Sequence, residues 1–60
     1  MMEAKYLVVR TDLVGTPLCD EKIVYSSVDN ISMEVGQVYF VTDDDFTGFC
    51  KILDKEICEV

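Results

Sequence analysis

Apolar and polar residues alternate along much of this chain, which predicts β-strands rather than helices. In residues 4–11 both alternating sets are apolar, Leu7 with Val9 on one side and Tyr6 with Val8 on the other. A short strand with two apolar faces is typical of a barrel or of a covered sheet. Val and Ile are abundant whereas Ala and Leu are few, and this balance also favours strands.

The second half of the chain predicts a meander of hairpins. Residues 31–35 alternate between apolar and polar and lead into a sharp turn at Gly36, and residues 37–42 form the clearest strand. A hairpin loop over residues 43–48 and a tight turn at Asp54 and Lys55 separate the remaining strands. The strands predicted after residue 30 are therefore 37–42, 49–53 and 56–60.

Residues 12–30 leave two possibilities open. Gly15 permits a positive φ and Pro17 fixes φ, so the stretch from 12 to 17 has turn chemistry. Residues 22–28 fit an irregular strand, but the same piece could form a single helical turn after Pro17. Residues 26–30 end in turn-forming side chains.

The pattern as a whole predicts one all-β domain over residues 1–60, with about five short antiparallel strands in a small barrel or sandwich. Closure into a barrel would remove exposed sheet edges, so it is the economical arrangement for so small a sheet. The residues expected inside are Leu7, Val9, Met33, Val38, Phe40, Ile52 and Val60.

The charge of the chain excludes one large class of function. Twelve acidic residues stand against five scattered basic residues, giving a formal net charge of −7 with no histidine. Proteins that bind DNA or RNA directly carry a basic face, so the sequence predicts no direct nucleic-acid contact. This charge suits solubility or a basic protein partner.

Location and redox state follow from what the sequence lacks. No apolar run approaches the roughly 20 residues that cross a bilayer, and no signal peptide is recognisable, so no membrane contact is expected. The three cysteines are odd in number and form no CxxC pair. A cytoplasmic protein with reduced thiols is the simplest interpretation.

Residues 31–54 combine an apolar turn, Gly36, a strand of the form x-V-Y-x-V, an acidic loop and a return strand. In this order they resemble the middle of SH3-like barrels. The resemblance is strongest to small SH3-like proteins encoded by bacteriophages and prophages, and it implies an SH3-like barrel acting in the host cytoplasm. The chain has no Trp and its only proline is Pro17, so it lacks the aromatic platform on which polyproline peptides dock.

The acidic run invites a metal-site interpretation that its spacing does not support. Asp43, Asp45 and Gly48 occupy the first, third and sixth places of a calcium loop, but Thr47 and Asp54 stand at the fifth and twelfth, and no flanking helix is predicted. A solvated hairpin tip is the expected state. Three cysteines without histidine do not complete a structural zinc site, so neither a metal nor a cofactor is expected.

Catalysis is not expected either. Cys50 and Cys58 are predicted on adjacent strands as free thiols that behave as small apolar residues, and no histidine can activate them. Asp44 and Asp45 could pair as acid and base only within a cleft, for which so short a chain has little material. The sequence therefore predicts no enzyme and no catalytic residues.

The favoured function is a small acidic module that binds a protein, a host protein if the phage resemblance holds. Acidic side chains would steer a basic partner, and aromatic side chains would either anchor it or fold back over the barrel end. The candidate binding residues are Tyr39, Asp43, Asp44, Asp45, Phe46 and Phe49. Two alternatives stay open: a nucleic-acid mimic with carboxylates spaced like phosphates, and a structural oligomer that pairs through residues 56–60.

Overall fold

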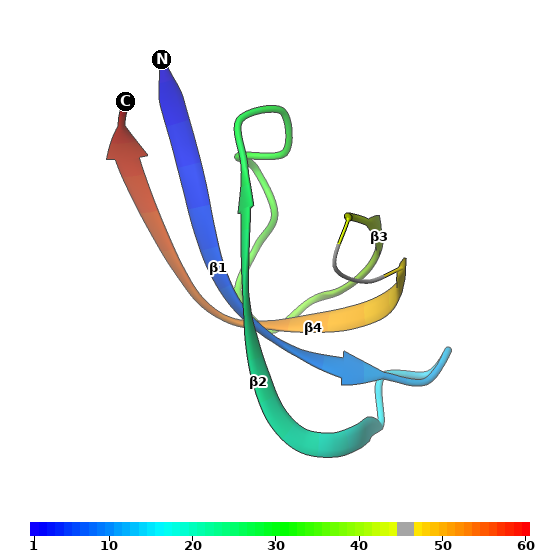
Figure 1. Ribbon diagram of the computed structural model, residues 1–60. Coiled ribbons are helices and arrows are strands. Elements are labelled where there is room, and N and C mark those ends of the chain that lie inside the picture. Colours follow the sequence, from blue (N-terminus) through cyan, green and yellow to red (C-terminus); the bar gives the residue numbers. More distant parts are fainter. Residues whose placement is uncertain (45–46) are drawn as a thin grey trace.

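The computed structural model describes residues 1–44 and 47–60 and shows one antiparallel sheet (Figure 1). Its strands are β1 (Met2–Thr11), β2 (Pro17–Ser27), β3 (Val38–Thr42) and β4 (Thr47–Glu59), in the spatial order β2-β1-β4-β3. The all-β prediction is confirmed, with four strands in an open sheet instead of about five. No helix in the described part of the chain is long and apolar enough to cross a membrane.

The strand count differs because the last two predicted strands are one. β4 runs through Asp54 and Lys55 without a turn, so the tight turn expected there is wrong. Leu7 pairs with Asp54 and Val8 with Ile52, which leaves Leu53 as the extra residue of a β-bulge. A bulge bends a strand, and Figure 1 shows β1 and β4 turning sharply near their middle.

β1 and β2 form a hairpin with residues 12–16 as its turn, so the choice that the sequence left open is settled as strand for β2. The carboxylate of Asp12 accepts hydrogen bonds from the N–H groups of Val14 (3.0 Å) and Thr16 (2.8 Å), which closes the turn before β2. Gly15 has φ +95° and lies against β3, because a Cβ there would come 3.0 Å from Val38 Cγ2. The turn therefore needs glycine for conformation and for space.

Residues 28–37, here called the crossing segment, connect β2 to β3 across the sheet (Figure 1). The hydroxyl of Tyr6 binds this segment to the sheet: it donates to the Asn30 carbonyl (2.5 Å) and accepts from the Met33 N–H (3.2 Å). The Tyr39 hydroxyl accepts from the Glu34 N–H (2.9 Å). Two tyrosines of the sheet thus satisfy backbone groups that no strand partner reaches.

The core lies on the sheet face that the crossing segment covers. Ile52 pairs with Val8 across β1 and β4, and Tyr6 pairs with Tyr25 with ring centroids 6.2 Å apart. The buried cluster contains Ala4, Tyr6, Val8, Tyr25, Met33, Val41, Cys50 and Ile52. We call this the core face and the opposite one the outer face.

The predicted interior is correct in part. Ile52, Met33 and Val9 are buried, and Leu7 and Val38 are half-buried. Phe40 and Val60 were expected inside, but they are 59% and 67% exposed.

The two errors have different causes. Both alternating sets of β3 are apolar, and Tyr39 and Val41 take the core face, which turns Phe40 outward. Val60 lies one residue beyond the end of β4, where its side chain remains exposed.

Burial of two weak acids makes the fold sensitive to alkali. Desolvation raises the pKa of the Cys50 thiol above its ordinary 9.0, and it raises the pKa of the Tyr6 hydroxyl above 10.0 by more than the hydrogen bond with Met33 lowers it. The folded state therefore holds these protons more tightly than the unfolded state. The contribution is fully present below pH 9.0 and is lost as the pH rises through the folded values.

We expect the urea midpoint to be constant from neutral pH to about pH 9 and to fall above it, first through Cys50 and then through Tyr6. Unfolding curves followed by circular dichroism at neutral pH and at successive values above pH 9.0 and 10.0 measure this. Cys50→Ala should lower stability at neutral pH but make the first part of the fall shallower. An equally steep fall in that variant would contradict the assignment to Cys50.

Candidate protein-binding surface

The edge strand β3 presents one large apolar side chain to solvent. Among the described strands β3 pairs with β4 alone, and Phe40 on its outer face is 59% exposed. Within β3, Tyr39 and Val41 pack on the core face, so strand alternation fixes the outward direction of Phe40. The exposure is thus imposed by the pairing of β3 with β4.

Phe40 does not stand alone. It lies directly opposite Phe49 of β4, and the two rings meet edge to face with centroids 5.1 Å apart and an interplanar angle of 73°. Such pairs contribute about 0.5–1.5 kcal/mol beyond area burial. The contact places the two rings side by side, so a partner would meet them as one aromatic surface.

The acidic loop lies at the end of the β3–β4 hairpin, beyond this aromatic pair. Thr42 and Thr47 close the β3–β4 hairpin, and between them Asp43 is half-buried and Asp44 is exposed. The predicted site residues Asp45 and Phe46 lie outside the described residues. The described carboxylates therefore sit at the hairpin end nearest to Phe40 and Phe49.

The structure separates Tyr39 from the other predicted site residues. Tyr39 pairs with Cys50 on the core face, whereas Phe49 is on the outer face. Its hydroxyl is engaged with the Glu34 N–H, and its ring packs against the core cluster. Tyr39 thus anchors the crossing segment, and Phe40 takes the exposed place that the sequence analysis gave to Tyr39. Recognising Phe40 from sequence would have required knowing which apolar set of β3 faces the core.

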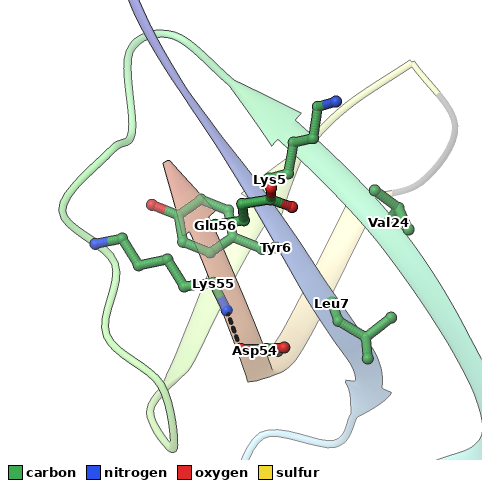
Figure 2. A pocket seen from close by; sticks show the side chains of 7 residues that line it. All are labelled: Lys5, Tyr6, Leu7, Val24, Asp54, Lys55 and Glu56. Atoms are coloured by element: carbon green, nitrogen blue, oxygen red, sulfur yellow. Dashed lines mark hydrogen bonds between the residues drawn. The ribbon is translucent and has the colours of Figure 1, made fainter. Parts of the chain in front are cut away.

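A small open cavity of about 240 Å³ lies further along the sheet, beside the bulge (Figure 2). Its apolar part comes from Leu7 and Val24, which are cross-strand partners, and Lys5 and Glu56 pair across β1 and β4. The lining residues are Lys5, Tyr6, Leu7, Val24, Asp54, Lys55 and Glu56. Cavities that bind small molecules usually measure about 300–1,000 Å³, so this one suits a single side chain better than a cofactor.

The cavity is separate from the aromatic pair. Asp54 lies five residues beyond Phe49 on β4, about 16 Å along an extended strand. Its residues come together only through the register of β1, β2 and β4 with the bulge included. No local motif in the sequence marks it.

The three thiols are free and differ in their exposure: Cys19 is exposed, Cys50 is buried and Cys58 is half-buried. Cys50 and Cys58 are on the same strand, so their predicted placement on adjacent strands is wrong, for the same reason as the turn at Asp54. Within residues 1–44 and 47–60, no three Cys, Asp or Glu side chains gather as a metal site would require.

Comparison with protein-family models, with curated proteins and with solved structures finds no match to this chain.

Proposed function

We propose that this chain is a protein-binding module whose contact surface is formed by Phe40, Phe49, Asp43 and Asp44, here called the aromatic–acidic surface. The observation that carries the proposal is the exposure of Phe40 (59%) in an edge-to-face pair with Phe49. Aromatic side chains at the centre of a polar rim are the usual anchors of protein interfaces.

The charge of the surface and of the whole chain indicates the partner. The chain carries a net charge of −7, and Asp43 and Asp44 follow the aromatic pair at the loop end of the β3–β4 hairpin. Negative potential accelerates encounter with a basic protein and sets its orientation. The outer edge of β3 can also accept an extended segment as an additional strand. The partner that fits is thus a basic protein with an exposed extended segment.

The SH3-like barrel class, the phage origin and the host cytoplasm belong to this proposal. They are supported by the pattern of residues 31–54, and the sharp bend of β1 and β4 is compatible with a barrel-like curvature. The module acts by binding, without catalysis or a cofactor.

Capture from bacterial lysate on the tagged, immobilised protein tests the surface. We expect a basic protein that is retained at low salt and released at high salt, because exposed charges beyond the Debye length are screened. Phe40→Ser should weaken retention at least about tenfold, as loss of an interface anchor does. Asp43→Asn with Asp44→Asn should slow association with the purified partner and reduce its salt dependence in stopped-flow measurements.

Val24→Ser is the matched control, since Val24 is 66% exposed but lies on β2. It should capture the same protein as the wild type. Equal capture by Phe40→Ser would rule out the aromatic–acidic surface, and loss only in Val24→Ser would move the contact to the cavity. A captured nucleic-acid-binding protein that duplex DNA displaces would favour the nucleic-acid mimic instead.

A further inference from the structure

The C-terminal half of β4 has a free backbone edge. β3 pairs with β4 only from Thr47 to Lys51, and the pairing ends where Ile52 exchanges hydrogen bonds with Gly36 (2.8 Å) and Gln37 (3.0 Å). Beyond Ile52, β1 is the only described strand beside β4, as Figure 1 shows for its red half. Such an edge can pair with a further strand.

The hydrogen bonds at the chain ends identify which residues point outward. The Val60 N–H donates to the Met1 carbonyl (2.8 Å), and the Met1 amine donates to the Val60 carbonyl (3.2 Å). Val60 therefore directs its N–H and its C=O toward β1. In an antiparallel strand every second residue does so, which here means Cys58 and Glu56. It follows that Lys55, Ile57 and Glu59 direct their N–H and C=O groups away from β1.

We propose that two copies of this chain pair along this edge as antiparallel strands, with the two-fold axis at Ile57. Each Ile57 then faces Ile57 of the second copy, and each Lys55 faces Glu59 of the second copy. In this register the backbone groups of Ile57 and Glu59 and the Lys55 carbonyl find partners, and the Lys55 N–H exchanges its hydrogen bond with the Asp54 carboxylate (2.8 Å) for one to the second copy. The side chains also match, since Lys55, Ile57 and Glu59 share the core face with Tyr6, Ala4 and Met2, to which they are paired.

Charge selects this register over its neighbours. Moving the axis to Glu56 or to Lys55 sets a residue opposite its own like charge, which is unfavourable across strands. Moving it to Cys58 leaves Lys55 beyond the end of the second strand and places Glu59 opposite Ile57. Charged edge residues usually prevent pairing, but the order Lys55, Ile57, Glu59 is complementary to itself when reversed. The contact also covers Ile57, which is 42% exposed.

The net charge of −7 on each copy opposes this association. Long-range repulsion is screened by salt more strongly than close cross-strand pairs. The dimer is therefore weak at low ionic strength and strengthens when salt is added. This inference is independent of the aromatic–acidic surface, because it concerns the purified protein alone and another strand edge.

Sedimentation equilibrium of the purified protein up to millimolar concentration, at moderate salt, tests the proposal. Wild type should show a monomer–dimer equilibrium. Lys55→Glu and Glu59→Lys should each weaken the dimer at least about tenfold, because each replaces two opposite-charge pairs by two like-charge pairs. The double variant restores both pairs in reverse and should dimerise like the wild type.

Lys22→Glu is the control, since it makes the same change of net charge on an exposed residue of β2, and at moderate salt it should weaken the dimer much less than Lys55→Glu does. Lys55→Glu also removes the contact of the Lys55 ammonium with the Tyr6 ring (5.8 Å) and could unfold the protein for that reason. In that case the Glu59→Lys variant, which keeps this contact, tests the proposal. A monomeric wild type, an unaffected Glu59→Lys variant, or a double variant that folds but does not dimerise would overturn the proposal.

Discussion

Replacement of Ile52 by alanine should leave much of the protein unfolded at physiological temperature. Ile52 has no exposed surface and pairs with Val8 at the centre of the core cluster. Truncation of a buried isoleucine to alanine costs about 2–5 kcal/mol, and the core of a domain this small rarely supplies more than about 3–5 kcal/mol. Thermal and urea unfolding followed by circular dichroism measure the loss.

Ile31→Ala is the matched control, because it makes the same truncation at a position that is 38% exposed in the crossing segment. It should cost no more than about 1 kcal/mol. Equal losses from the two substitutions would mean that the core does not centre on Ile52. A cooperative transition at the wild-type midpoint for Ile52→Ala would mean the same.

Local patterns were enough to predict β1, β3 and the hairpin that follows β3, whereas β2 stayed open between a strand and a helical turn. The alternation in residues 4–11 and 37–42 and the hairpin between β3 and β4 describe neighbours along the chain, and the structure shows β1, β3 and that hairpin. Ile52 and Met33 were also predicted inside correctly. These features depend only on period and turn chemistry.

What the sequence could not supply is the pairing between distant segments. Asp54 and Lys55 look like a turn because two adjacent polar residues interrupt an apolar pattern. In the structure they are in strand because β1 pairs alongside and a bulge at Leu53 resets the alternation. One inserted residue reverses which side chains face the core.

The candidate site was predicted incompletely for a related reason. Phe49 and the two described aspartates were named, but Phe40 was assigned to the core and Tyr39 to the surface. β3 is apolar on both sides, so its composition cannot tell which set is buried. The packing of Tyr39 and Val41 on the core decides it. The cavity at Leu7 and Val24 depends on register alone.

Removal of one hydroxyl, in Tyr6→Phe, should release the crossing segment from the sheet. Among the described hydrogen bonds, that hydroxyl donates to the Asn30 carbonyl and also accepts from the Met33 N–H, so one atom makes both bonds to the crossing segment. Phenylalanine keeps the buried ring and leaves the Met33 N–H without its partner, which costs about 1–3 kcal/mol, with a further loss at the Asn30 carbonyl. Urea unfolding gives the total, and amide hydrogen exchange should show faster exchange at Met33 than the global loss explains.

Tyr39→Phe provides the comparison, since among the described residues its hydroxyl accepts only from the exposed Glu34 N–H, which water can satisfy. Its cost should stay below about 1 kcal/mol, near the net value of one hydrogen bond. Tyr6→Phe should also remove the second part of the alkaline instability, because the hydroxyl with the raised pKa is gone. If Tyr6→Phe lost no more stability than Tyr39→Phe, the crossing segment would be held by the burial of Met33 alone.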